Sequence, residues 1–244
     1  MVDTVHRDTD GRGPVISVIV PVISDRPELW QIRKAVETST VPSELILVLS
    51  TSSRLASFKV HGENEKVVFF AKGGRGPSFV AGIASAKGEI VLLLHSDTVL
   101  PEGWDRAIVR ALDDKRIVGG AFSRDFDDAS VFYKVVSAVG WLLAHTVNEV
   151  WGDRAIFVRA DLLRRWTDDL DLPLFEDVVL SEHMRSAGRI IFLKERVTTS
   201  ADAFRRNGRL GHFWRIIRSR AWYSFGGDPE RICSYYYSPP GPRR

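Results

Sequence analysis

The sequence has little cysteine and no long apolar run. Cys233 is the one cysteine in 244 residues, so the chain can form neither an internal disulfide nor a zinc site built on clustered cysteines. The longest apolar run, Val135–Leu143, is far shorter than the roughly 20 residues that span a bilayer, and it fits a buried helix. Residues 1–14 are polar and contain no apolar signal-peptide core. These absences predict a cytoplasmic protein, although a secreted protein with little cysteine would have the same composition.

The patterns of nucleophilic hydrolases and of histidine zinc sites are also missing. No Gly-x-Ser-x-Gly elbow occurs, and Cys233 has no neighbouring base. The six histidines form no His-x-x-x-His pair. The glycine-rich segment 72–77 is not a Walker A loop, because no Gly-Lys-Ser/Thr follows it. Its backbone and Arg75 could still reach a phosphate, although a tight turn would also explain the glycines.

Positive charge is modest overall but unevenly distributed. The net charge is +3, and no nucleic-acid-reading module accompanies the arginines, so we expect no nucleic-acid binding. Six arginines lie close together in the C-terminal region: Arg205, Arg206, Arg209, Arg215, Arg218 and Arg220. In the same region, Trp214, Ile217, Ala221 and Phe225 fall near one helical face. That face belongs either to the core or to an interfacial helix that meets an anionic membrane surface.

The order of apolar segments predicts an α/β fold. Continuous β-branched and aliphatic runs predict strands buried on both faces at 15–22, 45–49, 67–70, 90–94 and 117–122. Helical spacing follows Pro27 and recurs at 78–86 and 102–112. Strands joined by helices indicate βαβ crossovers and a mostly parallel sheet. In the second half we expect strands at 155–158 and 190–193, helices at 130–143, 161–166 and 177–186, and helical structure beyond Thr199.

The segment His95-Ser96-Asp97 directly follows one predicted strand. Ligands of parallel sheets lie at the carboxyl ends of the strands, so these side chains should face a site. The Asp97 carboxylate could hold a divalent cation, and His95 could add a nitrogen ligand or a hydrogen bond to a phosphate. Alternatively, Asp97 caps a turn and His95 is a core histidine.

Two further acidic segments have structural explanations, and the first also has a chemical one. Glu176 and Asp177 open a predicted helix, where acids are favourable for capping and dipole reasons, but a carboxylate in a cleft can also act as a catalytic base. Asp153 follows Gly152 before a predicted strand, which is typical of a turn.

Taken together and in order, these segments resemble a family 2 glycosyltransferase with the GT-A fold, over about residues 16–236. They are most similar to a small bacterial-type subgroup with a His-Ala-Asp-Thr metal motif and a Glu-Asp base motif. The matching segments are Gly74-Arg75, His95-Ser96-Asp97-Thr98, Gly152-Asp153-Arg154-Ala155-Ile156-Phe157-Val158-Arg159, Pro173-Leu174-Phe175-Glu176-Asp177-Val178-Val179-Leu180, Thr198-Thr199-Ser200-Ala201 and Asp228-Pro229-Glu230-Arg231. Each match is modest, but the ordered set is specific.

The resemblance implies a Rossmann-like, mostly parallel central sheet flanked by helices, followed by a C-terminal helical extension. The implied segments are a flexible N-terminus at 1–14, a transferase domain at 15–203 with a nucleotide-binding half at 15–122 and an acceptor half at 123–203, a basic and aromatic extension at 204–237, and a disordered tail at 238–244. The implied partners are a nucleotide-diphosphate sugar and a hydroxyl acceptor. Separately from the resemblance, the arginine- and aromatic-rich segment 204–225 predicts contact with an anionic membrane surface. A lipid-linked acceptor would fit such a contact, and a small-molecule acceptor is the alternative.

The resemblance also implies roles for individual residues. Asp97 and His95 would hold Mg²⁺ or Mn²⁺ on the donor diphosphate. Asp177 would deprotonate the acceptor hydroxyl, and Glu176 would either support it or bind the acceptor. One base on the acceptor side implies a single displacement and inversion at the anomeric carbon. The nucleotide-sugar would be bound by Pro21, Asp25, Ser50, Arg75, Ser96 and Asp153.

Three departures from the family pattern fall on the nucleotide side. Ser24-Asp25 replaces an Asn-Glu pair, residues 50–53 contain no acid, and Val80 stands where an Asn is expected. The chain could therefore have an unusual donor specificity, or it could be a degenerate, glycosyltransferase-like binding or scaffold protein with weak or no donor binding. A sugar nucleotidyltransferase is disfavoured, because its glycine-rich run after the first strand is missing from 22–28.

Overall fold

The structure, a computed structural model, describes residues 13–22, 27–50, 60–70 and 74–238. Its strands are β1 (Ile16–Val22), β2 (Ser43–Ser50), β3 (Glu65–Phe70), β4 (Ile90–Leu93), β5 (Thr98–Val99), β6 (Ile117–Phe126), β7 (Ile156–Arg159) and β8 (Arg189–Thr199). Within the described residues they form one eight-stranded sheet in the order β3-β2-β1-β4-β7-β6-β8-β5. Strands β3, β2, β1 and β4 are parallel, as are β6 and β8, whereas β7 and β5 run antiparallel to their neighbours.

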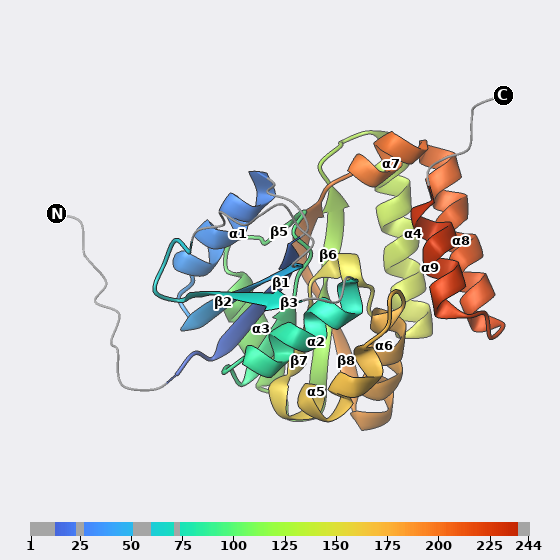
Figure 1. Ribbon diagram of the computed structural model, residues 1–244. Coiled ribbons are helices and arrows are strands. Elements are labelled where there is room, and N and C mark those ends of the chain that lie inside the picture. Colours follow the sequence, from blue (N-terminus) through green and yellow to red (C-terminus); the bar gives the residue numbers. More distant parts are fainter. Residues whose placement is uncertain (1–12, 23–26, 51–59, 71–73, 239–244) are drawn as a thin grey trace.

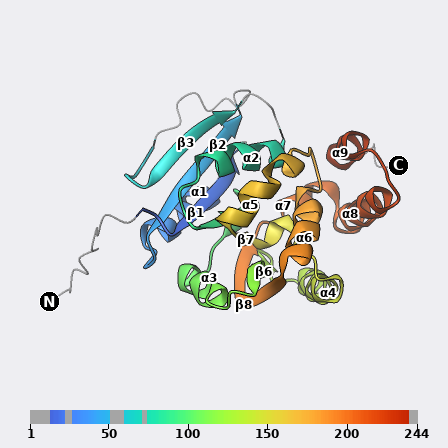
Figure 2. The same ribbon diagram turned by 90° about the horizontal axis from the view of Figure 1, so that it is seen from below.

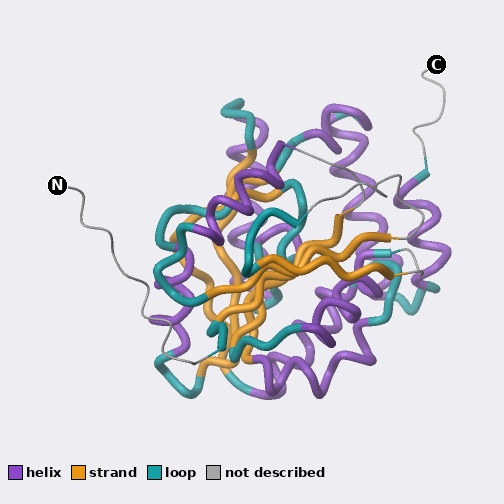
Figure 3. Tube along the Cα trace, turned by 60° about the vertical axis from the view of Figure 1, so that its left-hand side comes forward, coloured by secondary structure: helices purple, strands orange, loops and turns teal. Residues whose placement is uncertain are grey.

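Helices cover both faces of this sheet (Figures 1 and 3). They are α1 (Pro27–Glu37), α2 (Arg75–Ser85), α3 (Trp104–Leu112), α4 (Val131–Val147), α5 (Ala160–Trp166), α6 (Glu176–Ala187), α7 (Asp202–Asn207), α8 (Arg209–Ser224) and α9 (Pro229–Tyr237), with short 3₁₀ helices η1 (Gly152–Arg154) and η2 (Thr167–Leu170). Apolar residues of α1 and α3 pack on one face of β1 and β4, and those of α2, α5 and α6 pack on the other. The predicted α/β architecture with a mostly parallel sheet is confirmed.

The central strands are buried as their composition predicts. Every apolar residue of β1 except Pro21 is almost fully buried, and so are the four residues of β4. Strands covered by helices on both faces must be apolar at every position, which is why they appear as continuous runs. The carboxyl ends of β1 and β4 therefore border the most deeply buried part of the sheet.

The second half of the sheet differs from the sequence prediction. Strands β6 and β8 extend to Phe126 and Thr199, beyond the ends expected at 122 and 193. Their added residues are mostly polar and pair with each other, from Ser123 opposite Arg196 to Phe126 opposite Thr199. Such a half-exposed strand end carries little hydrophobic signal. The short strand β5 was not predicted.

Helix α2 begins at Arg75, three residues before the predicted start at Ser78. Part of the predicted glycine-rich loop is thus the first turn of this helix. A side chain at Gly76 would place its Cβ 2.3 Å from the carbonyl oxygen of Leu172. Glycine is needed there because α2 packs directly against the backbone that leads into α6.

The expectation that the apolar run Val135–Leu143 forms a buried helix is only half correct. The run is helical and lies in α4, but Val135, Leu142 and other residues of its outer side are exposed. One side of α4 packs on β6 and buries Tyr133, Ser137 and Ala144, while no described residue covers the other. Among the described residues, no helix is both long and apolar enough to cross a membrane.

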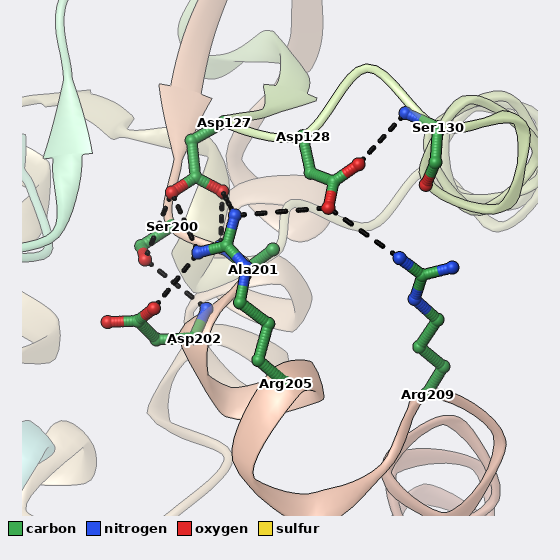
Figure 4. A network of polar contacts seen from close by, with 8 residues as sticks. All are labelled: Asp127, Asp128, Ser130, Ser200, Ala201, Asp202, Arg205 and Arg209. Carbon is green, nitrogen blue, oxygen red and sulfur yellow. Dashed lines mark hydrogen bonds and ion pairs between the residues drawn. The ribbon is translucent and has the colours of Figure 1, made fainter.

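The C-terminal helices α7, α8 and α9 lie along the same side of the molecule as α4 (Figures 1 and 2). A polar network fixes their start. The Arg205 guanidinium donates to Asp127 at 2.9 Å, and Arg209 lies 3.7 Å from Asp128 (Figure 4). Because Asp127 and Asp128 lie between β6 and α4, these contacts hold α7 and α8 against the beginning of α4. Helical structure beyond Thr199 is confirmed.

The predicted domain boundaries stay predictions. The flexible N-terminus expected at 1–14 and the tail expected at 238–244 lie almost entirely outside the described residues, which begin at 13 and end at 238.

Candidate active site

The turn His95–Asp97 follows β4 at the carboxyl edge of the sheet. The amide of Thr98 donates to the His95 carbonyl at 3.2 Å and closes the turn. The Asp97 carbonyl accepts from the Ser200 amide at 3.0 Å, and the Thr98 hydroxyl lies 3.4 Å from an Asp97 carboxylate oxygen. Strand β5 and the end of β8 therefore hold the backbone of Asp97 in place.

His95 is held as a neutral imidazole. Burial, together with the nearby Arg75 charge, lowers the pKa of His95 to about 3. The ring stacks near Phe79, with centroids 6.4 Å apart. Its Nε2 atom is buried, and no hydrogen-bond partner for it occurs in the described part of the chain. A buried imidazole nitrogen without a protein partner is suited to bind a metal or a ligand.

Glu176 and Asp177 lie at the first turn of α6, after a residue in an unfavourable conformation. Phe175 has φ +70°, a left-handed conformation that bulky residues rarely adopt. Its ring stacks on Tyr223 of α8 at 4.4 Å between centroids, so tertiary packing holds the strained residue in place. This conformation sets the direction from which both carboxylates enter the site.

Glu176 is paired with Arg75 by two hydrogen bonds, one from Nε and one from Nη2, the latter at 3.1 Å. The side chain of Glu176 is only 3% exposed, and burial raises its pKa despite the arginine. Burial alone would lower the pKa of Arg75, but the carboxylates of Glu176 and Asp177 raise it. The pair links the start of α2 to the start of α6, a contact that the sequence did not predict.

Asp177 and His95 both lie next to Gly152. The Gly152 amide donates to Asp177 Oδ2 at 2.8 Å. A Cβ atom at position 152 would lie 3.1 Å from His95 Nε2 and 3.3 Å from Asp177 Oδ2. The second Asp177 oxygen accepts from the Val178 amide at 3.0 Å. Two hydrogen bonds from backbone amides thus fix a carboxylate beside a neutral imidazole.

Asp153 lies beside two buried arginines that sequence reasoning missed. Its carboxylate accepts from Arg124, and Arg154 follows it in the chain. Burial alone would raise the pKa of Asp153, but both arginines lower it. Burial lowers the pKa of Arg154 to about 10. Arg154 belongs to the segment 152–159 that carries the resemblance, but no local feature of the sequence indicates that it and Arg124 are buried beside Asp153.

Helix α9 packs against the start of α6, which the sequence also did not predict. Ile232 of α9 is buried in a cluster with Leu174, Phe175 and Val178. The Cys233 thiol lies 3.7 Å from the Pro173 carbonyl. Burial raises the pKa of Tyr236 to about 12, and this group interacts electrostatically with Arg75, Asp153 and Asp177. The C-terminal helix is therefore a wall of the site.

The remaining predicted residues are more dispersed. Pro21 lies near the carboxyl end of β1, opposite Val48, and Ser96 lies in the turn between His95 and Asp97. Ser50 ends β2, whereas Asp25 lies outside the described residues. No group of three or more His, Cys, Asp or Glu side chains that could hold a metal occurs among the residues that the structure describes. A metal here would take further ligands from substrate and water.

Solved structures of glycosyltransferases share this fold. The mannosyltransferase PcManGT from Pyrobaculum calidifontis, in complex with GDP-Man and Mn²⁺, matches 93% of this chain and 70% of its own at 17% identity, with a TM-score of 0.64. Glucosyl-3-phosphoglycerate synthase from Mycobacterium tuberculosis, in complex with Mn²⁺, UDP-Glc and phosphoglyceric acid, matches 88% of this chain and 81% of its own at 18% identity, with a TM-score of 0.58. At this identity the matches establish the GT-A fold and nothing more about this chain.

The sequence itself carries the family assignment. No curated protein matches the chain. The family model described as "Glycosyl transferase family 2" matches residues 17–162, which cover β1 to β7 and contain the His95–Asp97 turn and Gly152. The match spans more than half of the chain, so this protein is a glycosyltransferase that belongs to family 2.

Proposed function

We propose that the chain transfers a sugar from a nucleotide-diphosphate sugar to an acceptor hydroxyl, with metal dependence and with inversion at the anomeric carbon. The observation that carries the proposal is the convergence of Asp177 Oδ2 and His95 Nε2 on Gly152, next to the Asp97 turn. A fixed carboxylate beside a neutral nitrogen ligand, at the carboxyl edge of a parallel sheet, suits a transfer site.

The metal would be Mg²⁺ or Mn²⁺, held by Asp97 and His95. The fit rests on the buried, unpartnered Nε2 of His95, whose low pKa keeps the imidazole neutral and able to bind a cation. Mg²⁺ keeps several water ligands and is commonly held by one or two protein groups plus phosphate oxygens. When bound, the metal would offset the negative charge that grows on the departing nucleoside diphosphate.

Asp177 would be the general base. Two amide donors orient its carboxylate, which prepares it to take the proton of an acceptor hydroxyl. Glu176 is occupied by Arg75, so it would position the base rather than react. One available carboxylate on the acceptor side supports a single displacement, which inverts the anomeric carbon.

The donor would contact the carboxyl ends of β1 and β2 and the turn after β4. Arg75 keeps 23% of its side chain exposed, and its guanidinium would reach the phosphates. Complexes of the two structural neighbours contain GDP-Man and UDP-Glc, so both nucleotide classes are candidates. The proposed donor contacts are Pro21, Asp25, Ser50, Arg75, Ser96 and Asp153.

The acceptor would be a lipid-linked or small-molecule hydroxyl, and the protein would be cytoplasmic and peripherally bound to the inner face of a membrane. Support comes from segment 204–225, whose Trp214, Ile217, Ala221 and Phe225 are exposed rather than part of the core. Four of its arginines, however, have partners within the protein: Arg205, Arg209, Arg215 and Arg220.

The experiment measures slow hydrolysis of UDP-glucose and GDP-mannose with Mn²⁺, since water can replace the unknown acceptor. We expect Asp177→Asn to slow hydrolysis by about 10²–10⁴-fold while nucleotide affinity changes less than threefold. Asp97→Ala should lose nucleotide affinity as well. The control is Glu182→Gln, an exposed carboxylate on the same helix, which should behave as wild type.

Wild-type hydrolysis by Asp177→Asn would refute the base assignment. Failure of wild type to bind any nucleoside diphosphate would instead favour the degenerate binding or scaffold protein.

A further inference from the structure

Helices α4 and α8 lie side by side and run in the same direction (Figures 1 and 2). At their N-terminal ends, the Arg209 guanidinium lies 5.2 Å from the Tyr133 ring centroid. At their C-terminal ends, Arg220 Nη2 lies 2.7 Å from Glu149 Oε2. Between these points, apolar residues of both helices pack in one cluster around Tyr133. The contacts of Arg205 with Asp127 and of Arg209 with Asp128 also hold the start of α8 near the start of α4 (Figure 4).

The outward side of this pair is apolar and uncovered. On α4 the exposed residues recur at helical spacing, as do those of α8. The inner side of α4 packs on β6 and that of α8 packs on α9, so both stripes point away from the domain. We call this surface the α4–α8 face and define it by Val131, Val135, Leu142, Leu210, Trp214 and Phe225. Leu142 is 59%, Trp214 60% and Phe225 91% exposed.

Exposed apolar side chains at this density are not typical of a free surface. A soluble protein scatters them singly, whereas a contiguous patch marks an interaction site. The outward-facing residues do not contribute to the core, because other residues of both helices, such as Tyr133 of α4 and Ser219 of α8, already pack inward. The outward residues therefore require another occupant.

The charge around the α4–α8 face indicates which occupant it is. Residues 129–148 and 203–227 contain no aspartate or glutamate. They contain seven cationic side chains: Lys134, Arg205, Arg206, Arg209, Arg215, Arg218 and Arg220. Lys134, Arg206 and Arg218 are exposed and form no ion pair within the described residues. Three acids that flank these segments, Asp127, Asp128 and Glu149, are paired with Arg205, Arg209 and Arg220. The remaining unpaired cations beside apolar residues complement an anionic lipid surface.

We propose that the α4–α8 face lies on a lipid bilayer that contains anionic phospholipid, with the apolar stripes of both helices inserted at the level of the headgroups. This goes beyond a contact through 204–225, because α4 supplies half of the face. A second copy of this chain is a poorer occupant, since it would bring the unpaired cations of both copies together. The proposal does not depend on the transfer reaction, and its test needs no donor or acceptor.

The test is flotation of the full chain with vesicles of phosphatidylcholine, with and without 30% phosphatidylglycerol, at low salt. Wild type should float with the anionic vesicles. Leu142→Glu on α4 and Trp214→Glu on α8 should each lower the partition coefficient at least tenfold, because each puts a charge where an apolar side chain inserts. The matched control is Phe69→Glu on β3, an equally exposed apolar residue outside the face, which should stay within twofold of wild type.

A second set of variants tests the charge without altering the apolar residues. Lys134→Gln, Arg206→Gln and Arg218→Gln should each weaken binding about fivefold at low salt, and the loss should shrink as salt screens the surface. Thermal denaturation of every variant checks that exposed substitutions leave the fold intact.

Three outcomes would overturn the proposal. Wild type could fail to float with anionic vesicles, or Leu142→Glu and Trp214→Glu could float like Phe69→Glu. Light scattering could also show a wild-type dimer that Leu142→Glu converts to a monomer, which would make the face an interface between copies of the chain.

Discussion

Removal of Arg75 should destabilise the protein in a strongly pH-dependent way. Arg75→Met keeps the apolar stem of the side chain but leaves the Glu176 carboxylate, 3% exposed, without its cation. A buried carboxylate without a partner takes up a proton instead of remaining charged. The free energy needed to protonate Glu176 sets an upper limit on the loss in the free energy of unfolding.

The limit follows from the usual pKa of 4.5 for glutamate. Protonating Glu176 at pH 7.5 costs at most about 4 kcal/mol, at about 1.36 kcal/mol for each pH unit above that value. At pH 5 the same cost is below about 1 kcal/mol. In the variant, the folded-state pKa of Glu176 lies above the unfolded value, so stability is retained at low pH and lost as pH rises.

The assay is urea denaturation of wild type and variant at pH 5 and pH 7.5. We expect the variant to lose about 2–4 kcal/mol at pH 7.5 and much less at pH 5. The double variant Arg75→Met/Glu176→Gln removes the charge as well as its partner, so it should recover most of the loss at pH 7.5. A loss that is equal at both pH values, or a double variant no more stable than Arg75→Met, would refute the pairing argument.

Three more predictions follow from single contacts. Gly152→Ala puts a methyl group 3.1 Å from His95 Nε2, so donor hydrolysis should fall about tenfold while the melting temperature changes by less than about 3 °C. Unchanged hydrolysis would contradict the importance of this close approach. Asp105 is buried and accepts three hydrogen bonds from Thr40 and Val41, which overcome burial and lower its pKa. Asp105→Ala should therefore cost about 2–3 kcal/mol at pH 7, and the difference from wild type in denaturation should begin to shrink as pH falls below about 4. Asp228 caps α9 by accepting from the Glu230 amide at 2.9 Å, and Asp228→Ala should cost about 1 kcal/mol in the same assay, whereas no change would show that the cap is dispensable.

The sequence predicts those parts of the fold in which local pattern and burial agree. Strands β1 and β4 are apolar at every position because helices cover both their faces, so their runs identify them. Pro27 marks the first turn of α1, where its missing N–H costs nothing. The His95–Asp97 turn follows from the rule that sites lie at the carboxyl ends of parallel strands.

The parts that could not be predicted depend on long-range contacts. Glu176 and Arg75 are 101 residues apart, and neither has a local feature that indicates the other. The composition of Val135–Leu143 shows that it forms a helix with a large apolar surface, but not which side finds a partner. Helix α9 is signalled by Asp228 and Pro229 at its start, whereas its contact with Phe175 depends on the arrangement of three helices.

The most direct test of the central claim is a thermal-shift screen of UDP, GDP, CDP and dTDP, each with and without Mn²⁺, on wild type and Asp97→Ala. A ligand at about 100 times its Kd should stabilise the fold by roughly 2.7 kcal/mol, which is a readable shift. We predict that one nucleotide stabilises wild type only with the metal and that Asp97→Ala abolishes the effect. A shift that survives in Asp97→Ala, or no shift with any nucleotide at millimolar concentration, would contradict a metal-dependent donor site at Asp97.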